Sequence, residues 1–235
     1  MQLFYNPNLI QNSKTTTFNK IESRHIVRVL RKVIGDELQI TNGKGLFFEA
    51  KISIANDKKC VADIFSIQEK PKTWNYYLHI AIAPTKSNDR FEWFLEKATE
   101  IGIDEITPII CQNSERKVVK EERLEKILQS AMKQSLKFNI PKLNRVTKFN
   151  DFINQNREGE YFIAHCEDGN KTVLKDSIKN TSKMTILIGP EGDFSTNEIK
   201  TALAKNITPI SLGESRLRTE TAAVFATSTI AIIHQ

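Results

Sequence analysis

The chain alternates between short apolar stretches and longer amphipathic stretches from residue 76 to residue 232. Short apolar runs bounded by turn residues predict buried strands, and apolar residues three or four positions apart predict helices. Strands that are each followed by a helix-length segment pair in parallel, with helices on both faces of the sheet. The sequence therefore predicts an α/β fold built on a mostly parallel sheet.

The alternation also predicts where the individual elements of this part lie. Strands are expected at residues 76–83, 106–111, 160–165, 185–188 and 208–212. Helices are expected at residues 121–137, 149–156, 172–179, 196–205 and 219–232. A further helix is expected to begin at an Asn88 or Asp89 cap and to end at Gly102.

Residues 1–70 have a different pattern, of short strands and turns. Expected strands at 38–41 and 46–54 flank Asn42-Gly43-Lys44-Gly45, a hairpin signal because Asn and Gly tolerate positive φ. A third strand is expected at 61–67 and one helix at 23–33. The segment Lys70-Pro71-Lys72 has the composition of a linker. We therefore predict a small β-barrel domain over residues 1–70 and an α/β domain over residues 73–235.

The net charge of the chain is +6, and residues 1–70 hold most of the excess, with 11 basic against 7 acidic residues. The expected helix there presents basic side chains opposite its apolar face: Arg24, His25, Arg28, Arg31 and Lys32. Such a face is either a phosphate-binding surface for RNA or an ordinary solvated helix surface. The residues alone favour the two readings about equally.

Other features exclude several classes of protein. No apolar run approaches the roughly 18–20 residues of a membrane span, and the N-terminal residues lack the pattern of a secretory signal. Cys60, Cys111 and Cys166 are far apart and odd in number, which indicates neither a disulfide framework nor a metal site. The four histidines show no ligand spacing. We expect a reduced, cytoplasmic protein with no membrane contact and no metal.

Two expected strand ends break at glycine and lead into helices: ILIGPEGDFS at residues 186–195 and SLGESRLRTETA at residues 211–222. Ligands of open α/β sheets bind beyond the carboxyl ends of the strands, so these segments are expected to form opposite walls of one small-molecule pocket. Gly189, Gly192 and Gly213 permit close approach of a ligand, although glycines in such positions more often form ordinary turns than a cofactor loop. Neither a dinucleotide fingerprint nor a P-loop is present.

Charged side chains accompany both segments. Glu191 is placed either to support the pocket or move a proton, or to cap the helix near Ser195. Arg216 and Arg218 suit contacts with phosphate or carboxylate groups, and an ion pair with the neighbouring Glu220 is the alternative. No G-x-S-x-G nucleophile elbow occurs.

The segments GPEGDFSTNEI and LGESRLRTETA, preceded by RFEWFLEKATEIGIDEITPI, resemble the RsmE family of ribosomal RNA methyltransferases, which belongs to the SPOUT superfamily. The stretch HIVRVLRKVIGDELQITNGKG is similar to the family's N-terminal PUA-like segment, so the resemblance covers essentially the whole chain. It implies methylation of N3 of a uridine in 16S rRNA of the small ribosomal subunit. It also implies a C-terminal trefoil knot, S-adenosylmethionine as the cofactor, and a homodimer through the knot region.

The resemblance further implies roles for individual residues. Cofactor-binding residues are expected in the two glycine-containing loops: Ile188, Gly189, Pro190, Glu191, Gly192, Leu212, Gly213, Ser215, Leu217 and Arg218. Catalytic roles are expected for Arg218, toward RNA or a uracil anion, and for Glu191. RNA contacts are expected from basic side chains of both domains: Arg24, Arg28, Arg31, Lys32 and Arg90.

The chain departs from the family pattern at three positions. Asp193 replaces the second glycine of the usual GPEGG, and aspartate tolerates turn conformations. In QSAMKQSLKFNIPKL, Lys133 stands for the usual Glu and Lys137 for the usual Arg, whereas Gln134 and Pro141 are kept. Two alternatives remain: a SPOUT methyltransferase acting on another RNA position, and a non-catalytic RNA-binding or ribosome assembly factor.

Overall fold

The computed structural model describes residues 2–155, 158–178 and 182–235. The chain divides into two compact units, of which the first comprises Met1–Thr73 with Gln129–Ile140, and the second Trp74–Leu128 with Pro141–Gln235. The segment Gln129–Ile140 belongs to the first unit because its backbone pairs with the hairpin loop there. Gly45 donates to the Phe138 carbonyl and Ile140 to the Gly43 carbonyl, both at 2.9 Å. The sequence-based boundaries, 1–70 and 73–235, assigned Gln129–Ile140 to the second domain.

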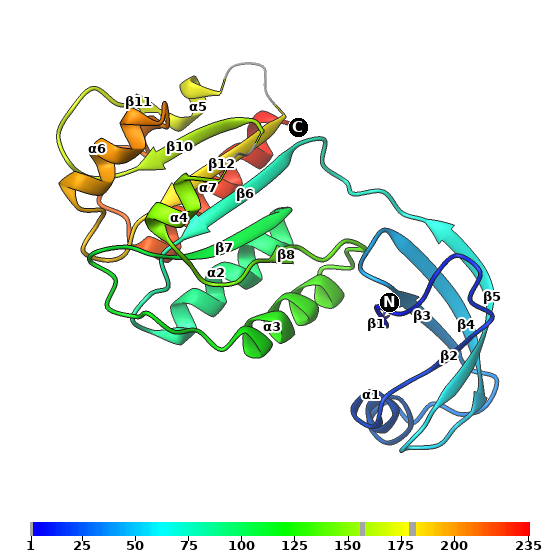
Figure 1. Ribbon diagram of the computed structural model, residues 1–235. Coiled ribbons are helices and arrows are strands. Elements are labelled where there is room, and N and C mark those ends of the chain that lie inside the picture. Colours follow the sequence, from blue (N-terminus) through cyan, green and yellow to red (C-terminus); the bar gives the residue numbers. More distant parts are fainter. Residues whose placement is uncertain (1, 156–157, 179–181) are drawn as a thin grey trace. The chain divides into compact units, whose positions relative to one another are not determined.

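The first unit contains a five-stranded sheet in the order β1-β3-β4-β5-β2 (Figure 1). Its strands are β1 (Leu3–Tyr5), β2 (Thr15–Thr17), β3 (Glu37–Thr41), β4 (Leu46–Ile54) and β5 (Val61–Glu69). The predicted hairpin is confirmed, because β3 and β4 pair antiparallel and Gly43 and Gly45 have positive φ. The end strands are linked by a hydrogen bond from Asn6 Nδ2 to Thr16 Oγ1 of 2.9 Å, which draws the sheet toward a barrel.

The helix of this unit is shorter than predicted and begins earlier. It consists of α1 (Lys20–Arg24) and a π-helical continuation, η1 (His25–Val29), instead of residues 23–33. The start is set by Asn19, whose side chain accepts a hydrogen bond from Glu22 N, as an N-cap does. The helix ends at Val29, and Arg31, two residues later, has a left-handed φ of 55° that cannot continue it. Ile26 is fully buried among the sheet residues Phe4, Ile40 and Phe48, so the apolar face covers the sheet.

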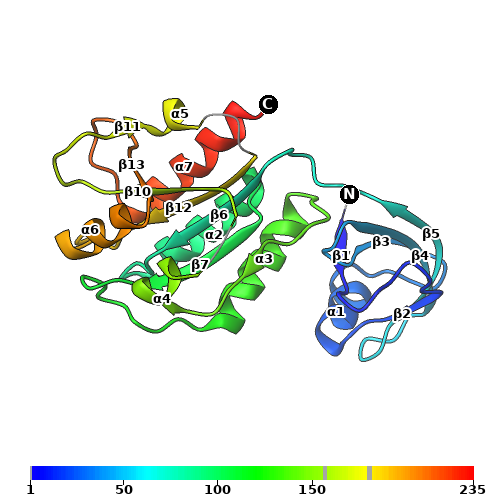
Figure 2. The same ribbon diagram turned by 45° about the horizontal axis from the view of Figure 1, so that its top comes forward.

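The second unit is built on an eight-stranded parallel sheet in the order β11-β13-β10-β12-β6-β7-β8, with β9 also pairing with β7. The strands from β11 to β7 are labelled in Figure 2. Its strands are β6 (Tyr77–Ile82), β7 (Glu105–Ile110), β8 (Lys142–Leu143), β9 (Thr147–Lys148), β10 (Glu160–Ala164), β11 (Thr172–Val173), β12 (Lys183–Ile188) and β13 (Thr208–Ser211). The prediction of an α/β fold with a parallel sheet is confirmed. The two-residue strands were missed because such short segments carry no periodic signal.

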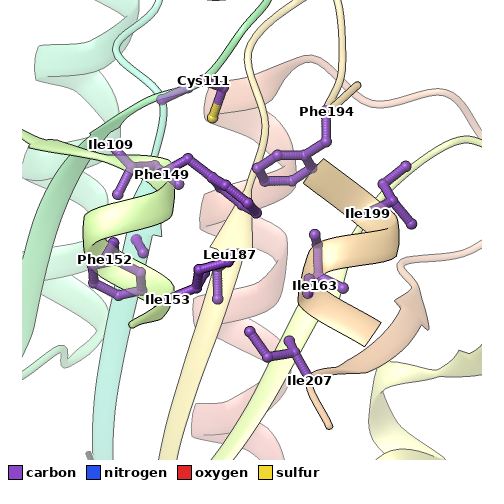
Figure 3. Close-up of a cluster of buried hydrophobic side chains, with 13 residues drawn as sticks. Ile109, Cys111, Phe149, Phe152, Ile153, Ile163, Leu187, Phe194, Ile199 and Ile207 are labelled. Atoms are coloured by element: carbon purple, nitrogen blue, oxygen red, sulfur yellow. The ribbon is translucent and has the colours of Figure 1, made fainter. Parts of the chain in front are cut away.

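Helices cover both faces of this sheet. They are α2 (Asn88–Ile101), α3 (Glu121–Gln134), α4 (Phe149–Ile153), α5 (Leu174–Ser177), α6 (Thr196–Ala204) and α7 (Thr219–Ile233). On one face, Phe149 and Phe152 of α4 and Ile199 of α6 form a buried cluster with Ile163 and Leu187 of the sheet (Figure 3). On the other face, α7 contacts β6, β12 and α2. The sheet is therefore the middle layer of three.

Several predicted helix boundaries were wrong for local reasons. Ser87 precedes α2 as its N-cap residue, one position before Asn88 and two before Asp89, the two expected caps. The helix α3 ends at Gln134 instead of residue 137, because Leu136 has a left-handed φ of 54°. The helices predicted at 149–156 and 172–179 end at Ile153 and Ser177. Residues 156 and 179 themselves lie outside the described residues.

None of the helices in the described ranges has the length and apolar character that a membrane crossing requires.

The start of α7 is anchored by a hydrogen bond of 3.0 Å from Thr219 Oγ1 to the Gly189 carbonyl, which immediately follows β12. The threading of the chain around this contact, the trefoil knot, stays a prediction. The anchor itself brings the two glycine-containing loops of the sequence together.

Candidate active site

A cavity of about 680 Å³ opens beyond the carboxyl ends of β10, β12 and β13 in the second unit. Its walls come from the three loops that follow these strands and from the first turn of α7. Nine of the ten predicted cofactor-binding residues line it: Ile188, Gly189, Pro190, Glu191, Leu212, Gly213, Ser215, Leu217 and Arg218. A volume of this size is typical of small-molecule sites. The expected pocket between two glycine-broken strand ends is therefore present.

The tenth predicted residue, Gly192, is not among the residues that line the cavity. A Cβ at this position would lie 3.2 Å from Asn113 Cβ, so the residue faces the loop after β7. Asn113 Nδ2 donates to the carbonyls of Gly192 and Asp193, at 3.0 and 3.1 Å. Gly192 thus serves packing between loops.

A third wall was missed from the sequence. It follows β10 and contributes Ala164, His165, Cys166 and Lys171 to the cavity. Lys171 Nζ donates to the carbonyls of His165 and Glu167, at 2.9 and 2.7 Å, which holds the loop in shape. The available signal was the strand expected at 160–165, since its carboxyl end must lie at the same sheet edge as the other two.

The loop after β12 is shaped by close contacts and a left-handed residue. A Cβ at Gly189 would lie 3.1 Å from two carbons of the Phe194 ring, so only glycine fits there without a shift. Asp193 has φ 61° and its N–H donates to the Pro190 carbonyl at 2.9 Å. Ser195 and Glu198 then form a capping box at the start of α6. The alternative reading of Glu191 as the cap of this helix is therefore wrong.

Glu191 lies at the cavity wall, half-buried, with its carboxylate turned to the loop after β6. Its Oε1 accepts a hydrogen bond of 2.9 Å from the backbone N–H of Lys86. The same loop is held by Arg116, whose Nε donates to the Thr85 carbonyl at 2.9 Å and whose terminal nitrogens donate to the Lys86 carbonyl and to Asn88 Oδ1. The position of Glu191 is thus fixed by a network of loop contacts.

Arg218 is the N-cap residue of α7 and is exposed at the cavity. It has a β-region backbone with φ −71° and ψ 156°, and its side chain makes no capping hydrogen bond. The side chain is therefore not held by the helix start, and its five N–H donors are available to an anionic or carbonyl oxygen of a ligand at the cavity.

Glu220 pairs with a residue other than its neighbouring arginines. Its side chain is 7% exposed, and Oε1 lies 3.8 Å from Arg90 Nε on α2. The alternative of an ion pair within the loop, between Glu220 and Arg216 or Arg218, is thus replaced by a contact between α7 and α2. Arg90, predicted to contact RNA, remains 43% exposed.

Two titratable groups of the third wall, His165 and Cys166, have shifted pKa values. Burial lowers the pKa of His165, and the nearby Lys171 ammonium lowers it further. His165 Nδ1 is buried and has no hydrogen-bond partner within the described part of the chain. Burial raises the pKa of the Cys166 thiol, with a further contribution from Asp193. Both effects on His165 favour its neutral imidazole.

The basic residues predicted to bind RNA in the first unit differ in their surroundings. Arg24 and Arg31 are exposed. Arg28 Nε donates to Asp57 Oδ2 at 2.8 Å, and this hydrogen bond lowers the pKa of Asp57. Lys32 Nζ donates to the Glu37 carbonyl at 3.0 Å. These side chains are at the surface, and their binding role stays a prediction.

The residues that depart from the family pattern have identifiable partners or surroundings. Lys133 Nζ donates to Glu22 Oε1 at 2.9 Å, within the first unit. Lys137 is partly buried, and burial lowers its pKa. Asp193 Oδ2 accepts from Cys166 N at 2.6 Å. Among the described residues, no group of three or more His, Cys, Asp or Glu side chains is arranged to hold a metal ion.

Comparison with known proteins agrees with this architecture. Residues 72–231 match the family model of an RNA methyltransferase domain, and residues 19–65 match that of an RNA methyltransferase PUA domain. The ribosomal RNA small subunit methyltransferase E of Buchnera aphidicola subsp. Acyrthosiphon pisum is 32% identical over 87% of this chain and 83% of its own. The enzyme of the same name from Rickettsia conorii is 29% identical over 99% of this chain and 95% of its own.

Solved structures give the same result. A protein from Porphyromonas gingivalis described as a probable rRNA-methyltransferase has a TM-score of 0.91 and 39% identity, covering 100% of this chain and 98% of its own. A methyltransferase from Legionella pneumophila, solved with bound SAM, has a TM-score of 0.87 and 29% identity, covering 97% and 96%. The chain is thus similar over nearly its whole length to both of these solved proteins.

Proposed function

Because this chain belongs to the RsmE family of RNA methyltransferases, whose domain models match both of its parts, we propose that it methylates ribosomal RNA with S-adenosylmethionine as the methyl donor. The proposed target is N3 of a uridine in 16S rRNA of the small ribosomal subunit, as the family resemblance implies. The supporting observation is the cavity of about 680 Å³ that the two family motifs enclose. A protein acting on ribosomal RNA is expected in the cytoplasm.

The lining of the cavity fits S-adenosylmethionine. Ile188 and Leu212 offer apolar surface to a ligand, and the two glycine-containing loops bring polar backbone to the wall of the cavity. His165 also lines the cavity, and its buried Nδ1 has no hydrogen-bond partner in the described part of the chain. When bound, the cofactor supplies a methyl group on a positively charged sulfur.

The chain's own residues must then prepare the uracil. N3 of uracil carries a proton and attacks only after losing it, so a nearby positive charge that stabilises the uracil anion speeds the transfer. Arg218 is proposed for this role, because its exposed guanidinium stands at the cavity without a capping bond. Glu191 is proposed to hold the loop after β6 in place through Lys86 N.

Binding of the RNA is proposed to involve basic residues of both units. In the first unit these are Arg24, Arg28, Arg31 and Lys32, which lie on or just after the α1–η1 helix. In the second, Arg90 remains accessible beside Glu220. Contacts of this kind fix the register of RNA and make affinity depend on salt.

We also propose a homodimer through the C-terminal region. Along α7, the apolar side chains of Phe225, Ile232 and Ile233 are 47%, 69% and 40% exposed. Exposed apolar residues on one helix are typical of a contact surface between subunits. Sedimentation of the purified protein at micromolar concentration tests this, and a monomer would contradict it.

Two measurements test the proposed function. Calorimetry with S-adenosylmethionine is expected to show binding, and no binding at millimolar ligand would exclude the methyltransferase and leave an RNA-binding or assembly factor. Mass spectrometry of 16S rRNA nucleosides from a strain lacking the gene is expected to show loss of 3-methyluridine. Unchanged 3-methyluridine, together with loss of another methylated nucleoside, would assign a different RNA position.

A further inference from the structure

Asp193 occupies a position where the family usually has glycine, and its side chain joins two walls of the cavity. Its Oδ2 accepts a hydrogen bond of 2.6 Å from the backbone N–H of Cys166, in the loop after β10. Its Oδ1 accepts from the N–H of Phe194 at 2.8 Å, in the loop after β12. A glycine here would make neither bond. The carboxylate thus connects the third wall to the loop that holds Gly189 and Glu191.

The same carboxylate adds a negative charge to the lining of the cavity. The other charged side chains around the cavity are Lys171, Glu191, Glu214, Arg216 and Arg218. Three of these five are cations and two are carboxylates, so Asp193 brings the lining to equal numbers of both signs. With glycine at residue 193, the lining would carry a net positive charge, which opposes a cationic ligand.

The charge of the cofactor changes during the reaction. The N3 lone pair of the uracil anion forms a bond to the methyl carbon, and the electron pair of the breaking carbon–sulfur bond stays on sulfur. S-adenosylmethionine is a sulfonium cation. Because the electron pair stays on sulfur, its product, S-adenosylhomocysteine, is a neutral thioether. A negative charge in the cavity stabilises the first and not the second.

We propose that Asp193 is a specificity-determining residue that makes the cavity favour the sulfonium cofactor over its thioether product. This inference rests on the proposed function, because it requires that the cavity binds S-adenosylmethionine. The consequence is that, at equal concentrations of the two, a larger share of the cavities holds fresh cofactor than holds product. Relatives with glycine at this position would lack this contribution to discrimination.

The size of the effect follows from the dimensions of the site. Asp193 lines a cavity of about 680 Å³, and this size limits the distance between its carboxylate and the sulfonium of a ligand that fills the cavity. At an effective dielectric constant near 20 and a separation of roughly 6–10 Å, the unscreened attraction corresponds to a preference of about 15- to 100-fold. Screening by salt over a Debye length of about 8–10 Å reduces this preference to about two- to tenfold.

The test is calorimetry of S-adenosylmethionine and S-adenosylhomocysteine with the wild-type protein and with Asp193→Asn. Asparagine tolerates the left-handed φ of 61° and keeps one acceptor oxygen, so the substitution removes the charge and one of the two hydrogen bonds that the carboxylate accepts from Cys166 N and Phe194 N. The lost hydrogen bond affects both ligands alike, so the ratio of their affinities reports the charge. We expect the ratio of the two dissociation constants, product over cofactor, to fall about two- to tenfold. An unchanged ratio would overturn the proposal, including the case in which both affinities fall equally.

Two further variants separate the charge from other effects. Asp151→Asn makes the same change at an exposed position of α4, which does not line the cavity, and should leave the ratio as in the wild type. Asp193→Gly removes both the charge and the link to Cys166 N, and should lower the ratio while weakening both ligands. If the wild type bound neither ligand, the proposed function itself would fail, which is a distinct result from an unchanged ratio.

Discussion

Glu191 Oε1 accepts a hydrogen bond of 2.9 Å from the backbone N–H of Lys86, which joins the loop after β12 to the loop after β6. The two residues are 105 positions apart in the sequence, and neither belongs to a helix or strand. An oxygen that accepts from a backbone N–H is partly committed to that bond. The contact therefore favours support of the cavity over proton transfer as the role of Glu191.

Glu191→Gln should retain most of the activity. The glutamine carbonyl oxygen can still accept from Lys86 N, so the loop keeps its position, whereas Glu191→Ala loses the bond. We expect kcat within about threefold of wild type for the glutamine variant and kcat/KM lowered about tenfold for the alanine variant. Steady-state kinetics on 16S rRNA checks this. A loss of kcat in the glutamine variant as large as in alanine would assign proton transfer to Glu191.

Arg116→Ala should destabilise the loop after β6, which supports the cavity through Glu191, although Arg116 does not line the cavity itself. The guanidinium donates to the carbonyls of Thr85 and Lys86 and to Asn88, yet Arg116 is not among the residues that line the cavity. Loss of these bonds is expected to lower the free energy of unfolding by about 1–3 kcal/mol and to weaken cofactor binding. Thermal melting and calorimetry measure the two effects. The exposed Lys117 gives a matched control, because Lys117→Ala should change neither.

Arg116→Lys distinguishes a positioning role from a simple effect of charge. Lysine keeps the positive charge but lacks the planar fork that reaches three acceptors at once. We expect it to behave like alanine in cofactor affinity. Affinity equal to wild type in Arg116→Lys would show that charge alone is sufficient.

Arg218→Ala should lower methyl transfer more than cofactor affinity. The exposed guanidinium is proposed to act on the uracil anion, which exists only on the way to the transition state, so its loss appears mainly in kcat. We expect a fall in the single-turnover rate of about a hundredfold or more, with a cofactor dissociation constant within about threefold. Arg145→Ala, at an exposed position away from the cavity, serves as control. Equal losses in rate and affinity would place Arg218 at the cofactor instead.

Cys166 reports on the occupancy of the cavity. It is exposed and lines the cavity, whereas Cys60 and Cys111 are buried, so an alkylating reagent should modify Cys166 first. Burial and Asp193 hold its pKa above the usual thiol value of 9.0, so alkylation should be slow at pH 7 and accelerate as the pH rises through that pKa. Bound S-adenosylmethionine should slow it further. Mass spectrometry of the labelled peptide gives the rate, and identical rates with and without cofactor would place the ligand elsewhere.

Asp193→Asn should change the same reaction in a defined direction. Removal of the neighbouring negative charge lowers the pKa of Cys166, because that charge disfavours the thiolate. At a fixed pH below the pKa, more thiolate is present and alkylation becomes faster. A slower reaction in this variant would mean that Asp193 does not act on the thiol through its charge.

The parts of the site that the sequence predicted share one property: a local signal in consecutive residues. Gly189 and Gly213 each follow an apolar run and precede a helix, so both the strand end and the turn are visible in a dozen residues. The third wall lacks such a signal. His165 and Cys166 follow an ordinary strand, and only the order of the parallel strands, with β10 between β12 and β13, brings them to the cavity.

Long-range pairing explains the other differences between expectation and structure. The helix predicted at 121–137 looks uniform in sequence, but from Gln129 onward it belongs to the first unit. The reason lies in Gly43 and Gly45, whose backbone groups pair with Ile140 and Phe138 almost a hundred residues later. Periodicity reports on the buried face of a helix and not on which partner covers it.

Lys133 and Glu22 form an ion pair within the first unit that should be testable by charge reversal. Lys133 Nζ lies 2.9 Å from Glu22 Oε1, and the side chains are 28% and 19% exposed. Lys133→Glu restores the residue usual in the family but places two carboxylates together, which should destabilise the chain by about 1–3 kcal/mol. Glu22→Lys should destabilise it as well, since it places two ammonium groups together and the introduced ammonium would also face His25.

The double variant Glu22→Lys with Lys133→Glu should recover part of the loss. It restores opposite charges at the same two positions. Its loss of unfolding free energy should therefore be smaller than the sum of the two single losses, by a coupling of about 0.5–3 kcal/mol. Chemical denaturation of all four proteins measures this coupling, and Lys126→Glu, on the α3 surface, controls for net charge. Strictly additive effects would mean that the two side chains do not interact in solution. A positive coupling would explain how this chain tolerates lysine where its family has glutamate: the partner on α1 carries the opposite charge.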